Sequence, residues 1–138
     1  MIAFYDSGCM SSRLFGIRGA VCCGNTVDEI QNAVEMMCSS LFSANEINAE
    51  DIVSIQFTIT PDLDAMNPAA ALRKSKCGSI VKNSALFCSQ EPVVKGSLPK
   101  TIRVLLTAYM QKNRIPVHCY TGGAEVLRPD FTLKAKEL

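Results

Sequence analysis

The clearest alternation of hydrophobic and polar positions lies near the middle of the chain. From Val53 to Ile59 every second residue is hydrophobic, and the residues between them are serine, glutamine and threonine. Successive side chains of a strand point to opposite faces of its sheet, so this pattern indicates one buried face and one polar face. It predicts a strand that ends before Pro61, because proline cannot continue the hydrogen bonding of a central strand.

Similar patterns predict further strands on both sides of this one. In the first of them Arg18 faces away from the hydrophobic residues, and Arg103 does the same in a later strand. These predicted strands span residues 14–21, 85–89, 101–110, 117–120 and 124–127. Together with the central strand they predict a mixed sheet of five or six strands.

Two segments follow helical spacing instead. Thr26 and Glu29 stand three residues apart, as in a capping box, and hydrophobic residues then recur every three or four positions as far as Leu41. This segment predicts one main helix that packs on the sheet. A shorter helix is predicted over residues 69–73, directly after Pro68, because proline is favoured in the first helical turn.

The composition is that of one ordinary domain, and it excludes several classes of partner. The chain has 138 residues, of which 48% are hydrophobic, enough for the core of one α+β domain. We expect this domain to span residues 14–138, with residues 1–13 as an extension of uncertain order. The 14 basic and 13 acidic side chains nearly cancel, so no nucleic-acid partner is expected. No hydrophobic run approaches the roughly 20 residues that cross a bilayer, so no membrane association is expected.

The seven cysteines predict reduced thiols in a cytoplasmic protein. Their number is odd, they form no C-x-x-C pair, and no secretory signal precedes them. The only histidine, His118, adjoins Cys119, and neighbours in a strand point to opposite faces, so no metal site is expected there. The sequence also lacks a Walker loop and a G-x-G-x-x-G turn. We therefore expect neither a metal nor a cofactor.

Four residues are candidates for chemistry on physical grounds. Arg18 and Arg103 interrupt hydrophobic strands, where an unpaired guanidinium is costly to bury. Each therefore pairs with a protein carboxylate, lies on an exposed sheet face, or binds a ligand that carries carboxylates. Glu91 follows a predicted strand and is either solvated or displayed for binding. Tyr120 either packs or contacts a ligand. No motif typical of nucleophilic catalysis accompanies them.

Four motifs, taken together, resemble one enzyme family. They are GIRGA at 16–20, TPDLDAMNPAAALR at 60–73, QEPVVKGSLPKTIRV at 90–104, and Tyr120 followed by VLRPD at 126–130. In this order and spacing the chain resembles the monofunctional chorismate mutases whose subunits form a trimeric pseudo-α/β-barrel. The resemblance implies an isomerase of aromatic amino-acid biosynthesis, which rearranges chorismate to prephenate in one pericyclic step without a cofactor.

The resemblance also implies roles for particular residues. Arg18 and Arg73 would grip the two substrate carboxylates, with Tyr120 on the carboxylate side. Arg103 would meet the negative charge that grows on the oxygen of the breaking ether bond, and Glu91 would contact the substrate hydroxyl on the ring side. The pocket would be lined by Phe87, Cys88, Ser89, Gln90 and Leu127. The implied partners are chorismate and prephenate, bound by a homotrimer with its active sites at subunit interfaces.

Three positions depart from the family pattern. Asn67 stands where some members have a large aromatic residue, Ala70 where some have a lysine, and Phe87 where a small polar residue can occur. These changes predict a pocket entrance of different polarity. The alternative function is a non-catalytic trimer that binds a carboxylate metabolite, which would need a residue such as Arg103 but not Glu91. A deaminase-like trimer would need a water-activating residue that the sequence does not offer.

Overall fold

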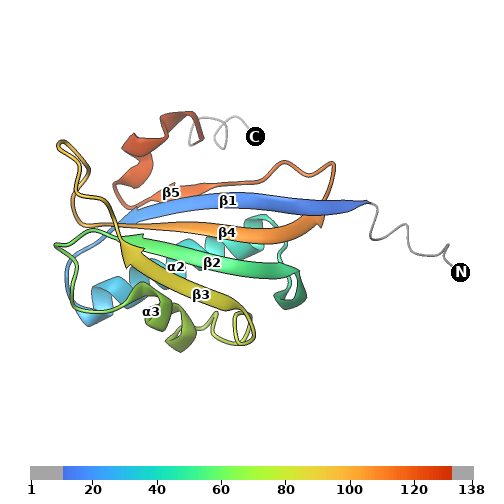
Figure 1. The fold of residues 1–138 in the computed structure, drawn as a ribbon, viewed down its shortest axis with the longest axis horizontal. Coiled ribbons are helices and arrows are strands. Elements are labelled where there is room, and N and C mark those ends of the chain that lie inside the picture. Colours follow the sequence, from blue (N-terminus) through green and yellow to red (C-terminus); the bar gives the residue numbers. More distant parts are fainter. Residues whose placement is uncertain (1–10, 132–138) are drawn as a thin grey trace, which may run out of the picture.

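A five-stranded mixed sheet forms the centre of the molecule in the computed structural model, which describes residues 11–131 (Figure 1). In sheet order the strands are β3 (Ala85–Gln90), β2 (Ile52–Ile59), β4 (Thr101–Gln111), β1 (Ser12–Cys22) and β5 (Cys119–Thr121). The predicted α+β class and strand number are confirmed. Most of the predicted extension, residues 1–10, and the end of the chain from residue 132 lie outside the described residues.

The central strand β4 pairs antiparallel with both of its neighbours, β1 and β2. The outer strands β5 and β3 pair parallel with β1 and β2. A parallel pair needs a long connection between its strands, and helix α3 lies in the one between β2 and β3. The helical segments are α2 (Val27–Ala44), α3 (Pro68–Lys74) and the short 3₁₀ turns η1 (Ala49–Asp51) and η2 (Ala124–Leu127).

Helices α2 and α3 pack on one face of the sheet and leave most of the other face open (Figure 1). The predicted stripe of α2 is buried from Ile30 onward, with Ile30, Met37 and Leu41 fully inaccessible, whereas Val27, the first residue of the predicted stripe, is 51% exposed. These side chains meet the inward residues of the strands, including Ile17 and Ile102. The core therefore lies between the sheet and the helices. None of the helices in the described residues is long and apolar enough to span a membrane.

Helix α2 begins and ends at specific polar contacts. The Thr26 hydroxyl accepts a hydrogen bond from the Glu29 amide at 3.1 Å, as the sequence spacing predicts. At the other end the buried Asn45 side chain donates to the Leu41 and Val117 carbonyls at 2.8 and 2.9 Å. Its Oδ1 accepts from the Val117 amide at 2.8 Å. Asn45 therefore ties the end of α2 to the segment that leads into β5.

Two further local predictions are wrong. Val53 was expected on the buried face, yet it is 44% exposed, because the pairing of β2 with β4 shifts register between Ile52 and Ser54. The predicted strand at residues 124–127 is the 3₁₀ turn η2. Gly123 adopts a left-handed conformation with φ of 104°, which starts the turn instead of extending the chain.

Candidate active site

The sheet face turned away from the helices carries most of the candidate residues. Paired residues on neighbouring strands point to the same face, so strand register shows which side chains lie in one row. One row crosses all five strands and consists of Tyr120, Ala20, Arg103, Thr58 and Ser89. Three predicted site residues thus share a row although they are widely separated in sequence.

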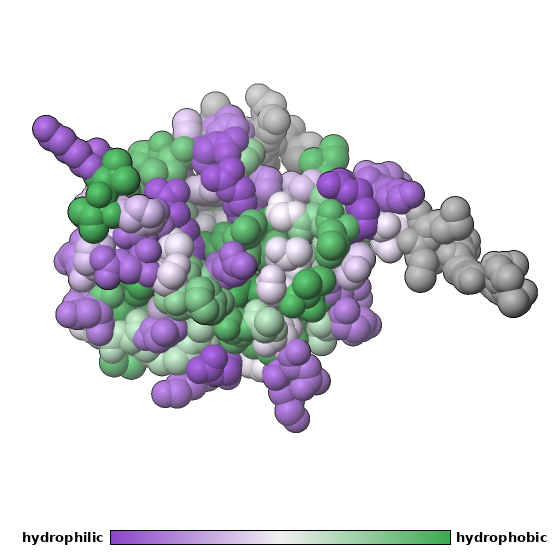
Figure 2. Space-filling view, in the orientation of Figure 1, coloured by the Kyte–Doolittle hydropathy of each residue, from purple (hydrophilic) through white to green (hydrophobic). Residues whose placement is uncertain are grey.

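A second row lies beside the first on the same face. It consists of Arg18, Leu105, Gln56 and Phe87. Leu105 is 40% exposed and Phe87 is 65% exposed, so this face is partly hydrophobic. Figure 2 looks onto it: green and pale side chains cover much of its middle, and purple side chains concentrate around its rim.

A hollow of about 250 Å³ opens where the two rows meet. Its lining comes from four strands and consists of Arg18, Gly19, Gln56, Thr58, Arg103, Val104, Leu105 and Tyr120. Three of the four residues predicted to be catalytic therefore line one hollow. The fourth, Glu91, contacts two of the lining residues, Thr58 and Arg103.

Glu91 is placed by the end of β3 and by β2. Its backbone amide donates to the Ile59 carbonyl at 2.9 Å, which extends the pairing of these strands by one residue. The Thr58 hydroxyl donates to Oε1 of Glu91. The same oxygen lies 3.4 Å from Nε of Arg103 in an ion pair. The predicted position of Glu91 at a strand end is confirmed, and its side chain turns back over the sheet.

The guanidinium of Arg103 is only partly neutralised by this ion pair. Its Nε is buried and lacks a hydrogen-bond partner, because the contact with Glu91 has no hydrogen-bond geometry. Within residues 11–131 its two terminal nitrogens form no hydrogen bond, and the side chain is 35% exposed. Arg103 thus has a protein carboxylate as partner, yet retains free donors beside the hollow.

Arg18 has no carboxylate partner among the described residues, and its side chain is exposed beside the hollow. Its backbone amide donates to Nδ1 of His118 at 2.9 Å, just before β5 begins. Burial and the positive charges of Arg18 and Arg128 hold the pKa of His118 below its ordinary value, while Asp130 acts in the opposite sense. A neutral His118 can accept this hydrogen bond, and it thereby helps to fix the backbone that carries Arg18.

Tyr120 both packs and lines the hollow. It is 8% exposed and forms a small hydrophobic cluster with Ala20 and Ala124, against which Leu127 packs. The Phe131 ring lies 5.7 Å from that of Tyr120. The turn η2 therefore covers the β5 end of the open face, and Leu127 supports Tyr120 from there.

The start of β4, two residues before Arg103, is fixed by a polar network. Asp62 accepts hydrogen bonds from the Lys100 amide at 3.0 and 3.1 Å and from the Thr60 hydroxyl at 2.6 Å. The bond from Thr60 is the main cause that holds the pKa of Asp62 below its ordinary value. These bonds accompany a left-handed Lys100 with φ of 50°, a conformation that non-glycine residues rarely adopt. The network thus sets where β4 enters the sheet.

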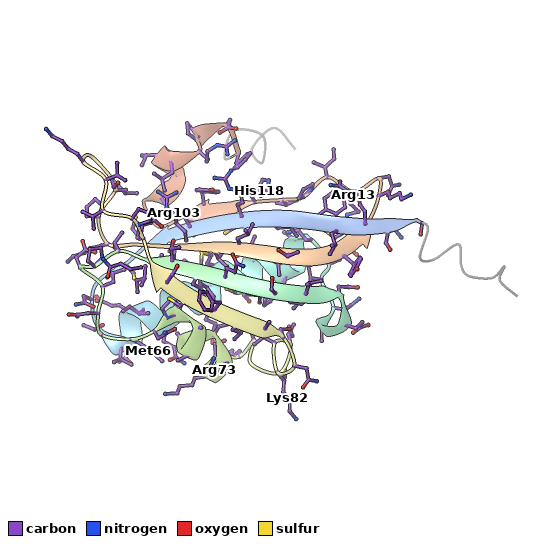
Figure 3. All side chains as sticks on the ribbon, in the orientation of Figure 1. Arg13, Met66, Arg73, Lys82, Arg103 and His118 are labelled. Carbon is purple, nitrogen blue, oxygen red and sulfur yellow. The ribbon has the colours of Figure 1, made fainter. Side chains whose placement is uncertain are left out.

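Several predicted residues lie away from the hollow. Arg73 is on α3, well separated from Arg103 on β4 (Figure 3), and has no ion pair within the described part of the chain. Cys88 points to the opposite face from Ser89 and packs against the core. Gln90 is exposed at the end of β3. One chain therefore brings together only part of the predicted set.

Two polar side chains that line the hollow were not predicted as site residues from the sequence. Thr58 and Gln56 are the polar positions of the β2 alternation, and that alternation places both on the face opposite the core. Which strand they face depends on register, which the sequence does not show. The departure at Asn67 has a local explanation, because its side chain accepts from the Ala69 amide at 2.8 Å and caps α3.

Comparisons with known proteins agree on one family. The family model described as chorismate mutase type I matches residues 14–131. The chain is 34% identical over 120 residues to chorismate mutase AroH of Bacillus subtilis, covering 86% of this chain and 92% of that protein. It is also 34% identical over 120 residues to chorismate mutase AroH of Thermus thermophilus, covering 84% and 94%. A solved chorismate mutase from Clostridium thermocellum superposes with a TM-score of 0.72 at 36% identity, covering 81% of this chain and 98% of that one.

Proposed function

Because the chain belongs to the chorismate mutase type I family, we propose that it rearranges chorismate to prephenate at the hollow between β1, β2, β4 and β5. Membership confirms the family resemblance drawn from the motifs and the expectation of an isomerase. The observation that carries the proposal is the cluster of Arg18, Arg103 and Tyr120 on one sheet face, with Glu91 beside Arg103. Within residues 11–131 it combines guanidinium donors that form no hydrogen bond with the carboxylate of Glu91.

The rearrangement is intramolecular, so the residues have to bind and orient but not to transfer protons. The ether C–O bond breaks while a C–C bond forms within the same molecule. In our proposal Arg18 holds a substrate carboxylate, with Tyr120 on the same side, which favours the compact reactive shape. The terminal nitrogens of Arg103 donate to the ether oxygen as its negative charge grows. Glu91 accepts from the substrate hydroxyl on the ring side.

A homotrimer with shared active sites is the second part of the proposal. The hollow of about 250 Å³ is small and open for a dicarboxylate ligand, since ligand sites usually measure roughly 300–1,000 Å³. Arg73, the other proposed carboxylate grip, lies away from it on α3. A neighbouring subunit that covers the open face would close the hollow and supply Arg73, together with Phe87 and the backbone of Cys88 on β3.

The open face has the composition of an interface. Leu14, Leu105, Tyr109 and Phe87 are each between 40% and 65% exposed on its strands. Exposed hydrophobic groups of this extent on one face are typical of association surfaces. We assign this face to the trimer contact.

The extent of the domain and its location complete the proposal. We infer that residues 14–138 form the catalytic domain, since the family model begins at residue 14. The six cysteines in the described residues are free thiols, which supports a cytoplasmic location, because thiols stay reduced there. A variant that begins at Met10 tests the extension: its turnover should equal that of the full chain.

The function is tested by following the loss of chorismate absorbance and the formation of prephenate by the purified full chain. Turnover by the assembled protein is the expected result. Calorimetric binding of chorismate without turnover would instead identify the non-catalytic metabolite-binding protein. Neither binding nor turnover by a folded trimer would reject both functions.

A further inference from the structure

Thr58 occupies a particular position in the hollow. It lies on β2 directly opposite Arg103 on β4, and its hydroxyl donates to Oε1 of Glu91. That oxygen is also the atom that lies 3.4 Å from Nε of Arg103. One carboxylate oxygen thus contacts both members of a cross-strand pair.

The geometry of the ion pair is unusual for an arginine and a carboxylate. Such groups favour two parallel hydrogen bonds, in which two nitrogens of the guanidinium donate to two oxygens. Here the contact recorded is the one at Nε, without hydrogen-bond geometry, and both terminal nitrogens of Arg103 donate no hydrogen bond among the described residues. A bidentate pair through a terminal nitrogen would use up a donor that the proposed reaction requires.

Little else holds the Glu91 carboxylate in this position. Its backbone is fixed by the hydrogen bond from its amide to the Ile59 carbonyl, but that bond leaves the side-chain torsions free. Within residues 11–131 the Thr58 hydroxyl is the only hydrogen-bond donor to the carboxylate. The orientation of Glu91 therefore depends on this hydroxyl.

We propose that Thr58 is a positioning residue, whose hydroxyl holds Glu91 at the Nε side of Arg103 and keeps both terminal nitrogens of Arg103 available to the substrate. The inference rests on the proposed function, which it deepens. Thr58 acts through Glu91 and not by taking part in the bond changes. Without the hydroxyl, Glu91 rotates toward the terminal nitrogens and weakens the donor that the transition state needs.

The test compares two substitutions at this position. Thr58→Val keeps the shape of the side chain but removes the hydroxyl, and Thr58→Ser keeps the hydroxyl. For the valine variant we expect kcat to fall about tenfold or more with KM within about threefold of wild type, the scale for a hydrogen bond to a charged group that matters in the transition state. The serine variant should stay within about threefold of wild type in both constants. Thr58→Ala repeats the comparison if the valine variant fails to assemble.

Ser43→Ala is the control for loss of a hydroxyl. Ser43 is exposed on α2, on the side of the sheet away from the hollow, and its hydroxyl makes no hydrogen bond in the described part of the chain. The substitution removes a hydroxyl far from both the hollow and the open face, so wild-type kcat and KM are expected. Light scattering on every variant checks that assembly is unchanged.

A crystal structure of Thr58→Val separates this inference from the proposed function. The expected change is rotation of the Glu91 carboxylate toward the terminal nitrogens of Arg103. An unmoved carboxylate, wild-type kcat in the valine variant, or an equal loss in the serine variant would overturn the positioning role. If wild type shows no turnover, the proposed function fails, and the position of Glu91 in the variant then decides the inference by itself.

Discussion

The side chain of Arg103 joins a buried Nε to terminal nitrogens that form no hydrogen bond within residues 11–131. A donor fixed in this way stabilises negative charge that appears only during reaction, because no reorganisation is needed at that moment. We therefore expect Arg103→Ala to lower kcat by about a hundredfold or more, the scale for the loss of one preorganised donor. The measurement is chorismate turnover at saturating substrate.

Arg114→Ala is the control for that substitution. Arg114 pairs with Glu46 at 3.0 Å on the surface, outside the hollow. Loss of an exposed ion pair has little effect on stability, and kcat is expected to stay at the wild-type value. Unchanged turnover in a folded Arg103→Ala protein would contradict the role assigned to that residue.

The ionisation of His118 makes the stability of the fold depend on pH. The pKa of His118 is lower in the folded protein than in the unfolded chain, so the folded state binds the proton less readily. The contribution of the neutral side chain to stability is therefore fully present above about pH 6.5 and is lost as the pH falls through the folded pKa. His118→Asn retains an acceptor for the Arg18 amide but cannot titrate. Urea unfolding from pH 5 to pH 8 should show wild-type stability falling relative to the variant below about pH 6.5. Parallel curves over that range would refute the assignment.

At the scale of elements, the contact between α2 and the lead into β5 depends on Asn45. Its amide donates to two carbonyls and its oxygen accepts from the Val117 amide, all in a buried position. Asn45→Asp removes the donors and places a carboxylate against both carbonyls. We expect the free energy of unfolding to fall by about 2 kcal/mol or more. Asn83→Asp, at an exposed loop position, is the control and should be neutral; denaturant unfolding measures both.

Elements that depend on local pattern could be predicted from the sequence, and contacts that depend on register could not. The stripe of α2 and the outward position of Arg103 follow from spacing within one segment. The turn at residues 124–127 was mistaken for a strand, since four residues carry too little periodicity to outweigh the left-handed Gly123. The contact of Thr58 with Glu91 requires β2 and β3 to be aligned, and their contact with Arg103 requires β4 as well, which no single segment specifies. The roles assigned by family resemblance stay predictions.

At the scale of the whole molecule, the open sheet face determines assembly. Leu14 and Tyr109 are paired on this face and are 44% and 47% exposed. In the proposed trimer they are buried against a neighbour, where an unpaired carboxylate is costly. Leu14→Glu should therefore reduce the particle mass measured by light scattering and abolish turnover, although it leaves the hollow unchanged.

Ile115→Glu provides the matched control for the interface. Ile115 is 82% exposed in the connection between β4 and β5, outside the sheet. The same charge introduced there should leave both mass and turnover at wild-type values. A trimer that persists in Leu14→Glu would show that the subunits associate through a different surface.

The separation of Arg73 on α3 from Arg103 on β4 has a genetic consequence. If each site takes one arginine from each of two neighbours, a mixed trimer of Arg73→Ala and Arg103→Ala chains always contains one interface that retains both arginines. Two alleles that are each inactive should then complement each other when co-expressed. Growth of a strain that lacks its own chorismate mutase, without added phenylalanine and tyrosine, reads this out. A chain that carries both Arg73→Ala and Arg103→Ala, co-expressed with an empty vector, should not support growth.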